Sequence, residues 1–393
     1  MSARQRPPAC RDGLSCTELN LLMTHSSTAM RLRAIGLSDE LLQQLPALTP
    51  AGTVNAPQRV TEVQREGVTL HDGLAEHGAR LLPALRHQLA DQSDAVAVGD
   101  WVWADCDPHG QRWVHTRLPP LNQLARRLHD GRDKVTRTVI VSNVDTALLV
   151  MGLDSDFHLR RIERYLALVQ MAGVRPVVVL SKADLCADPR TRLREVQALL
   201  SSGAAAVTLN ALGDEPRQVL SGWLGEGQTL VLLGSSGAGK STLTNSLTGA
   251  LDGSAHQPTG GNRAGDGRGR HTTTARSLHL LAGGACIIDT PGLRTLRLDG
   301  DADALGAVFG DITRLALQCR FRNCGHGDEP DCAVRAGVAT ERLKSFQKLL
   351  RETRRDTQTA LERKVQVSEW KARGRQAAAR MAHKRGEEDL NRR

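Results

Sequence analysis

The stretch Thr229–Leu247 reads TLVLLGSSGAGKSTLTNSL and predicts a strand, a glycine-rich loop and a helix in direct succession. Residues 229–233 form an apolar run of strand length, and the helix is expected to begin near Ser241. The loop between them has the spacing Gly-x4-Gly-Lys-Ser, in which backbone N–H groups converge on phosphate oxygens at a helix N-terminus. A chance turn rich in glycine and serine is the alternative, but it would not explain the flanking strand and helix. The stretch therefore predicts a phosphate-binding loop in an α/β fold.

Two side chains of this loop have roles that follow from the motif. Lys240 is expected to reach the β- and γ-phosphates of a nucleotide, and the Ser241 hydroxyl to bind Mg²⁺. Both are therefore candidate catalytic residues. The expected phosphate-binding set is Gly234, Ser235, Ser236, Gly237, Ala238, Gly239, Lys240, Ser241 and Thr242.

The motif Asp289-Thr290-Pro291-Gly292 follows a second apolar run, residues 285–288. A carboxylate at the carboxyl end of such a strand lies where an outer-sphere Mg²⁺ ligand is found, and the Gly292 N–H can bond a γ-phosphate. Alone, this tetrapeptide would more often be an ordinary turn. Behind a phosphate loop, it predicts a nucleotide-dependent switch.

The motif Ser181-Lys182-Ala183-Asp184 follows a third apolar run, residues 177–180. The Asp184 carboxylate can accept hydrogen bonds from guanine N1–H and the exocyclic amine. Adenine does not offer these donors, which disfavours an ATP-using enzyme. The Lys182 stem is expected to lie along the base. Ser181 stands where Asn or Thr is usual, and its hydroxyl lacks the reach of an amide.

The order of these motifs is unusual. In an ordinary GTPase the base-reading K-x-D motif comes last, whereas here it precedes the phosphate loop. A parallel sheet tolerates this circular permutation, because a binding site depends on spatial neighbours rather than on chain order. A second base-contacting loop is expected at Asn210 and Ala211, after the K-x-D motif.

The segment between the phosphate loop and Asp289 has the composition of a switch. Residues 260–270 are rich in glycine and arginine and lack apolar periodicity, so we expect them to be mobile until a ligand orders them. Thr273 or Thr274 is the expected sensor of the γ-phosphate and Mg²⁺. Leu293 stands where many GTPases place a water-orienting Gln, so a partner or another residue must complete the site. His271 is a candidate for this catalytic role, and a structural role in the switch is the alternative.

A cluster of metal-ligand type lies near the C-terminal end. Cys319, Cys324, His326 and Cys332 place three thiols and one imidazole within a short segment. This set matches a structural zinc site with four protein ligands and no position left for water. A disulfide cluster and a coincidence of buried cysteines are the alternatives. Residues 1–22 lack the sustained apolar core of a signal peptide, and a reducing compartment disfavours disulfides, so we expect one structural Zn²⁺.

Patterns along the rest of the chain predict several domains. Short runs such as 59–63 and 67–70, separated by turn residues, favour a small antiparallel barrel. Residues 148–151 then form a strand, and residues 159–171 carry apolar side chains at helical spacing. The expected boundaries are residues 1–50 for an extension of uncertain order, 51–137 for the barrel, 138–300 for the GTPase domain, 301–350 for a zinc-binding domain and 351–393 for a basic tail.

Together these motifs resemble the circularly permuted, ribosome small-subunit-dependent GTPase A family over about residues 60–346. Further runs typical of that family are VGDWV at 98–102, SNVD at 142–145, LDSDF at 153–157 and LRRIERYL at 159–166. The resemblance implies an N-terminal OB-fold barrel, a central circularly permuted α/β P-loop GTPase and a C-terminal, α-rich zinc-binding domain. It also implies a GTP hydrolase that the small ribosomal subunit stimulates. Such an enzyme acts late in maturation of that subunit, with hydrolysis driving release.

The net charge of the chain indicates which partners it could bind. The chain has 52 Lys and Arg against 43 Asp and Glu, a net charge of +9, and basic residues are frequent after Leu350. A basic arm would neutralise RNA phosphates with salt-dependent affinity; a solvated helix face is the alternative. Aromatic residues make up only 3% of the chain, so Trp101, Trp103 and Trp113 are as readily core residues as platforms for base stacking.

The expected partners are GTP and GDP, the small ribosomal subunit and its rRNA. No apolar run approaches the length of a membrane span, so we expect a soluble protein without membrane contact. We also expect a monomer and a cytoplasmic location. The competing interpretation comes from a different functional class. It is an RNA-binding assembly scaffold whose nucleotide is mainly structural.

Overall fold

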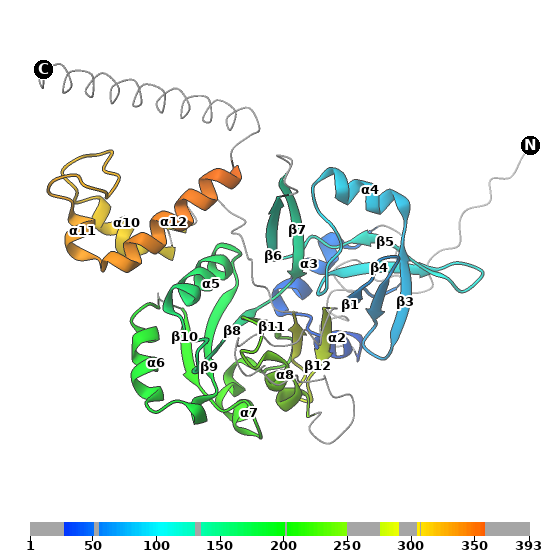
Figure 1. The fold of residues 1–393 in the computed structure, drawn as a ribbon. Coiled ribbons are helices and arrows are strands. Elements are labelled where there is room, and N and C mark those ends of the chain that lie inside the picture. The colour runs from blue at the N-terminus through cyan, green and yellow to red at the C-terminus, as the bar shows by residue number, and fades with distance from the viewer. Residues whose placement is uncertain are drawn as a thin grey trace, which may run out of the picture. The chain divides into compact units, whose positions relative to one another are not determined.

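The computed structural model describes residues 27–50, 55–129, 135–200, 203–249, 276–290, 305–306 and 308–357. The chain divides into two compact units, Met1–Arg126 with Arg137–Leu296, and Arg127–Thr136 with Arg297–Arg393. The first unit holds a barrel and a parallel sheet, and the second holds the helices α10, α11 and α12 (Figure 1).

The parallel sheet has the strand order β10-β9-β8-β11-β13-β12, and only the last pair runs antiparallel. Every residue of β8 and β11 is buried, as expected for strands covered on both faces. The predicted strands and their parallel alignment are therefore confirmed. The strands are β8 (Thr146–Gly152), β9 (Arg175–Ser181), β10 (Ala205–Thr208), β11 (Thr229–Leu233), β12 (Ser277–Leu280) and β13 (Cys286–Asp289).

Helices cover this sheet. The predicted helix over residues 159–171 is α5 (Leu159–Met171), which packs against β8 and β9 and buries Ile162, Leu166 and Val169 at helical spacing. The helix expected after the phosphate loop is α8 (Lys240–Thr248), which packs against β13. The other helical segments of this part are α6 (Pro189–Gln197), α7 (Glu215–Val219), η1 (Ala183–Leu185) and η2 (Ser221–Trp223).

The predicted small barrel is present before the sheet. Its strands pair in the order β1-β2-β3-β5-β4, and β4 pairs back with β1, so the barrel is closed. Only β3 and β5 run parallel, and a helix, α4 (Pro83–Asp91), connects β3 to β4. The strands are β1 (Gln58–Val63), β2 (Val68–His71), β3 (Glu76–Leu81), β4 (Trp101–Cys106) and β5 (Arg112–Arg117).

Two helices that the sequence patterns did not predict cover one side of the barrel. They are α2 (Ser27–Arg33) and α3 (Asp39–Leu48), and α3 begins at Ser38, whose side chain accepts a hydrogen bond from the Leu41 N–H. Leucines of this segment form a cluster with Trp101 and Trp103, which are 0% and 1% exposed. These two tryptophans are therefore core residues rather than stacking platforms.

One buried arginine joins the barrel, the N-terminal helices and the parallel sheet. Arg59 lies on β1, is 0% exposed and stacks 4.9 Å from the centre of the Trp101 ring. Its guanidinium donates to the carbonyl of Gly36 at 2.8 Å, the carbonyl of Asn143 at 3.1 Å and the hydroxyl of Thr229 at 3.1 Å. Thr229 begins β11, so this arginine reaches the strand that leads into the phosphate loop.

Backbone pairing makes a second connection between barrel and sheet. Strand β1 pairs with β12 through Glu62 and Ser277, so the strands of both parts belong to one hydrogen-bonded sheet. A separate two-stranded ribbon consists of β6 (Gln123–His129) and β7 (Val135–Ser142).

In the second unit, α10 (Gly310–Ala316), α11 (Ala333–Gly337) and α12 (Thr340–Thr357) pack together. Arg342 of α12 donates two hydrogen bonds to Asp311 of α10, at 2.7 and 2.9 Å, and the Phe309 and Phe346 rings lie 5.2 Å apart. Helix α12 continues past residue 350, where we expected a tail to begin; residues 358–393 lie outside the described part. No helix within the described ranges is long and apolar enough to span a bilayer.

Replacing the buried arginine is expected to destabilise the first unit. Arg59→Met would leave two carbonyls and a hydroxyl without their buried donor, so we expect a loss of about 3 kcal/mol. Urea unfolding measures the change. Arg80→Met, at an exposed arginine of β3, is the matched control and should stay within about 0.5 kcal/mol of the parent. Equal midpoints for both variants would contradict the role assigned to Arg59.

Candidate functional site

Three predicted motifs meet at one edge of the parallel sheet. Strands β9, β8, β11 and β13 are consecutive neighbours running in the same direction. Their carboxyl ends therefore lie side by side, which is where ligands bind in α/β sheets. Ser181 ends β9, Gly234 follows β11 and Asp289 ends β13. The motifs are therefore neighbours in space, although their order along the chain is permuted.

The phosphate loop has the backbone conformation that its glycines allow. Gly237 and Gly239 have φ angles of 84° and 92°, in the left-handed region that glycine enters without strain. At Gly234 the constraint is space, because a Cβ there would lie 2.3 Å from the Val150 carbonyl oxygen of β8. Gly239 then leads directly into the first turn of α8. Ser241 and Thr242 lie in that turn, where free N–H groups favour anions.

Lys240 is folded against the loop that it belongs to. Its side chain is 7% exposed, and Nζ donates to the carbonyls of Gly234 at 3.0 Å and Ser235 at 2.8 Å. Burial lowers the pKa of Lys240, while the carboxylates of Asp289 and Asp156 act in the opposite direction. The ammonium group is thus held beside the backbone that would surround a phosphate.

Ser181 connects the K-x-D motif to the phosphate loop. Its Oγ donates to the Ala238 carbonyl at 2.6 Å, and the residue is fully buried. From the sequence, we expected the hydroxyl to lack the reach of an amide. The structure brings the two backbones close enough for the short side chain to span the gap. A Cβ added at the neighbouring Gly239 would lie 3.6 Å from this Oγ.

The residues predicted to read the base lie in the short turn that follows β9. Lys182 adopts a left-handed conformation with φ 57°, and Asp184 is exposed within η1. The predicted second loop lies beside this turn, since the Ala183 N–H donates to the Leu209 carbonyl at 3.4 Å. The carbonyl of Ala211 accepts a 2.5 Å hydrogen bond from Ser246 of α8. The Asn210 N–H donates to the Glu215 carboxylate at 3.1 Å.

The Asp289 motif is anchored to the strand of the phosphate loop. Asp289 pairs with Leu232 in the sheet register and is 2% exposed. The Thr290 hydroxyl donates to the Leu232 carbonyl at 2.6 Å. The other expected residues of the switch segments lie outside the described residues: His271, Thr273, Thr274, Gly292 and Leu293.

Two acids at this edge have contacts with the motifs that were not predicted. Asp154 pairs with Lys182, and Asp156 accepts a hydrogen bond from Ser235 of the phosphate loop. The available signal was the run Leu153–Phe157 directly after a buried strand, since acids at that end of a parallel strand often serve a binding site.

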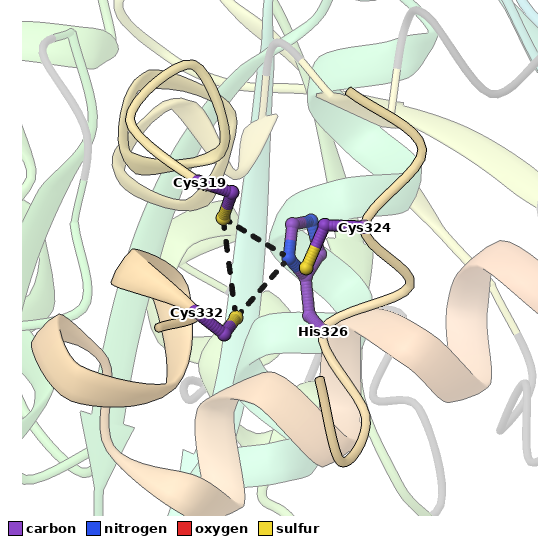
Figure 2. A group of neighbouring side chains, drawn as sticks. All are labelled: Cys319, Cys324, His326 and Cys332. Carbon is purple, nitrogen blue, oxygen red and sulfur yellow. Dashed lines mark hydrogen bonds between the residues drawn. The ribbon is translucent and has the colours of Figure 1, made fainter. Parts of the chain in front are cut away.

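The predicted metal-ligand residues come together in the second unit, as Figure 2 shows. One ligand atom from each of Cys319, Cys324, His326 and Cys332 lies within 4.8 Å of the others. The Cys319 and Cys332 sulfurs are 3.9 Å apart, and they lie 3.7 and 3.6 Å from His326 Nδ1. Tetrahedral zinc bonds imply edges of about 3.8 Å between sulfurs and about 3.5 Å from sulfur to nitrogen. The cluster therefore fits one tetrahedral metal ion.

The segment around His326 is held in place by groups that are not ligands. The Glu329 carboxylate accepts from the N–H groups of Gly325 at 2.9 Å and Gly327 at 2.7 Å. Gln347 of α12 donates to the His326 carbonyl at 3.1 Å. Cys332 precedes α11, and its sulfur accepts from the Arg335 N–H at 3.5 Å. Such outer contacts orient ligands before a metal binds.

Purified protein is expected to carry one metal ion per chain through this cluster. Cys324→Ala removes one thiolate ligand, so the variant should lose the ion to a chelator that leaves the parent loaded. Mass spectrometry of metal content after gel filtration measures this. Cys106→Ser changes an exposed cysteine of the barrel and should keep the full content. Equal retention in both variants would rule out a metal at this cluster.

Comparison with solved structures supports the permuted fold. The structure is similar to that of YjeQ from Thermotoga maritima, with a TM-score of 0.54, 23% identity, and coverage of 76% of this chain and 98% of that one. It is also similar to YloQ, described as a circularly permuted GTPase, with a TM-score of 0.51, 20% identity, and coverage of 79% and 99%.

Comparison of sequences identifies the family. The family model RsgA GTPase matches residues 119–299. A protein of Xylella fastidiosa, strain 9a5c, named small ribosomal subunit biogenesis GTPase RsgA, is 44% identical over 283 residues, or 72% of this chain and 80% of its own length. The protein of that name from Mesorhizobium japonicum is 42% identical over 308 residues, 77% and 84% of the two chains. With relatives this similar over most of their length, the chain belongs to the RsgA GTPase family.

Proposed function

We propose that this protein is a GTP hydrolase that acts in the maturation of the small ribosomal subunit. One observation carries the enzymatic part. The phosphate loop and the guanine-reading turn meet at one sheet edge, joined by the hydrogen bond from Ser181 to Ala238. Relatives at 40–44% identity that are named small ribosomal subunit biogenesis GTPase support the biological role.

The geometry supports a division of the nucleotide between two groups of residues. Asp184 would accept from the guanine N1–H and amine, with Lys182 along the base. The phosphate-loop N–H groups and Lys240 would surround the phosphates, and Ser241 and Asp289 would hold Mg²⁺ directly and through water. Bound there, Mg²⁺ neutralises charge that develops on the phosphate oxygens. The Lys240 ammonium would exchange its two carbonyl partners for phosphate oxygens.

The water that attacks the γ-phosphate needs an orienting group. Leu293 has no polar atom to supply one, so we propose that another residue or the subunit completes the site. His271 and the threonines Thr273 and Thr274 remain candidates from the sequence. In this proposal the free enzyme is slow, and docking on the subunit accelerates turnover and then release.

We propose zinc as the metal of the cysteine cluster. Three thiolates and one imidazole are ligands that Zn²⁺ favours, and four protein ligands leave no position for a reactive water. The ion would therefore stabilise the fold of the second unit rather than take part in hydrolysis. In the described part, α11 begins at one ligand, Cys332, so a loaded site would fix the start of that helix.

We interpret the barrel as an OB-fold that contacts RNA. Its closed strand order and the helix between β3 and β4 support this interpretation. Because Trp101 and Trp103 are buried, they are not available to stack on bases. Recognition of phosphate backbone and RNA shape by a chain of net charge +9 is the contact that we favour. We expect a monomeric, cytoplasmic protein.

The central experiment compares GTP and ATP turnover with and without purified small ribosomal subunits at two salt concentrations. We expect hydrolysis selective for GTP that rises sharply with subunits and less so at high salt. Lys240→Ala should abolish the stimulated rate. Turnover that does not change when subunits are added, or no turnover with either nucleotide, would instead support the RNA-binding scaffold.

Exchanging the base-reading carboxylate should change which base is bound. Asp184→Asn loses the charged acceptor for guanine N1–H and the amine, so GTP affinity should fall about 100-fold. Xanthosine triphosphate carries an oxygen in place of that amine, and its affinity should rise because an amide can donate to it. Competition binding measures both. Asp91→Asn on the exposed end of α4 is the control, and a parallel loss for both nucleotides would oppose the assignment.

A further inference from the structure

The connection between β8 and α5, residues 153–158, belongs to none of the nucleotide motifs, yet it contacts two of them. It begins at the same sheet edge, where the Leu153 N–H donates to the Ser181 carbonyl at 2.9 Å. A compact turn follows: Asp154 accepts from the Asp156 N–H at 3.0 Å through its side chain and from the Phe157 N–H at 3.1 Å through its carbonyl. This turn, called the acidic turn below, fixes the directions of two carboxylates.

The first carboxylate holds the lysine of the base-reading motif. Asp154 Oδ2 lies 2.6 Å from Lys182 Nζ, and both side chains are about four-fifths buried, with 23% and 21% exposed. Burial alone would raise the pKa of Asp154, but the hydrogen bonds from Lys182 and the Asp156 N–H outweigh it and keep this pKa below its usual value. The ion pair is therefore the stable form at neutral pH.

Glycine at position 152 makes room for this pair. A Cβ on Gly152 would lie 2.7 Å from Asp154 Oδ1 and 3.5 Å from Lys182 Cδ. The lysine stem thus passes close to the end of β8 on its way to the carboxylate. Without Asp154, nothing else among the contacts of the described residues fixes this ammonium group.

The second carboxylate holds the phosphate loop. Asp156 accepts a 2.5 Å hydrogen bond from the Ser235 hydroxyl and pairs with Arg161 in the first turn of α5. Its negative charge acts on buried Lys240 as well. The phosphate loop therefore has two side-chain anchors from neighbouring strands. Ser181 fixes its Ala238 end, and Asp156 fixes its Ser235 end.

We propose that Asp154 and Asp156 are positioning residues for the two halves of the nucleotide. Asp154 sets the Lys182 stem for the base, and Asp156 sets the Ser235 side of the phosphate loop. This inference rests on the proposed GTP-binding function and adds a specific division of labour within it. In this proposal neither acid contacts the reacting atoms. Asp154 acts through Lys182, and Asp156 acts through Ser235 and through its negative charge.

The two roles have different signatures. Guanosine diphosphate and triphosphate share the same base, so the loss of Asp154 must weaken both by the same factor. Asp156 places a negative charge beside the phosphates, and its removal also frees the positive charge of Arg161. Neutralising Asp156 must therefore favour the more highly charged triphosphate. An asparagine keeps an oxygen that can accept from Ser235, so it isolates the charge from the hydrogen bond.

The test measures GDP and GTP dissociation constants of the full-length protein by fluorescence titration. For Asp154→Ala we expect both affinities to fall about tenfold with an unchanged GTP to GDP ratio, because one charged hydrogen bond is lost. Asp154→Glu, which retains a carboxylate, should recover part of that loss. For Asp156→Asn we expect the ratio to shift at least threefold toward GTP, and the shift should shrink at high salt.

Controls separate the possible failures. Asp91→Asn, which removes an exposed acid of the barrel helix α4, should change neither constant. Thermal unfolding confirms that each variant is folded. If the parent protein binds GTP, Asp154→Ala within twofold of the parent would overturn the role of Asp154 alone. Asp156→Asn at the parental GTP to GDP ratio would overturn the role of the Asp156 charge alone. Parent protein that binds neither nucleotide would overturn this inference together with the proposed function.

Discussion

The candidate nucleotide site depends on one constraint, the parallel alignment of β9, β8, β11 and β13. Because these neighbours run in the same direction, every loop that follows them emerges at one edge. That edge brings together the turn predicted to read guanine, the acidic turn, the phosphate loop and the Asp289 motif. Chain order is irrelevant to this geometry. A permuted chain can therefore build the same site as an ordinary one, provided that the strands keep their neighbours and their directions.

Short polar contacts then fix the loops relative to one another. Ser181, Asp156 and Thr290 each connect one loop or strand end to the phosphate loop or its strand, over 2.6, 2.5 and 2.6 Å. All three are short side chains, so they hold the backbone with little conformational freedom to lose. Such a framework positions donors before a ligand arrives, which lowers the ordering cost of binding.

Arg59 connects the barrel to this set of loops and strands. Burying a guanidinium costs free energy unless its donors find acceptors. Here the acceptors are in the turn between α2 and α3, at Asn143 and at the first residue of β11. The β1–β12 pairing adds a backbone connection. The barrel and the parallel sheet are consequently joined by buried side-chain and backbone hydrogen bonds. By contrast, the cysteine cluster is organised locally, within the second unit, by ligands that are close in sequence.

Features that rest on local spacing could be predicted from the residues alone. The phosphate loop, the helix at 159–171, the strands before each motif and the zinc-type ligand set could all be predicted, because their residues lie within one turn or one short segment. Contacts between distant segments became visible only in the folded chain. Ser181 reaches Ala238 across 57 positions, Asp156 reaches Ser235 across 79, and Arg59 reaches Thr229 across 170. The packing of α2 and α3 on Trp101 and Trp103 could not be predicted from the sequence either. A spacing pattern shows which residues belong to the same helix or strand. The distance between two such elements depends instead on how they pack in the folded chain.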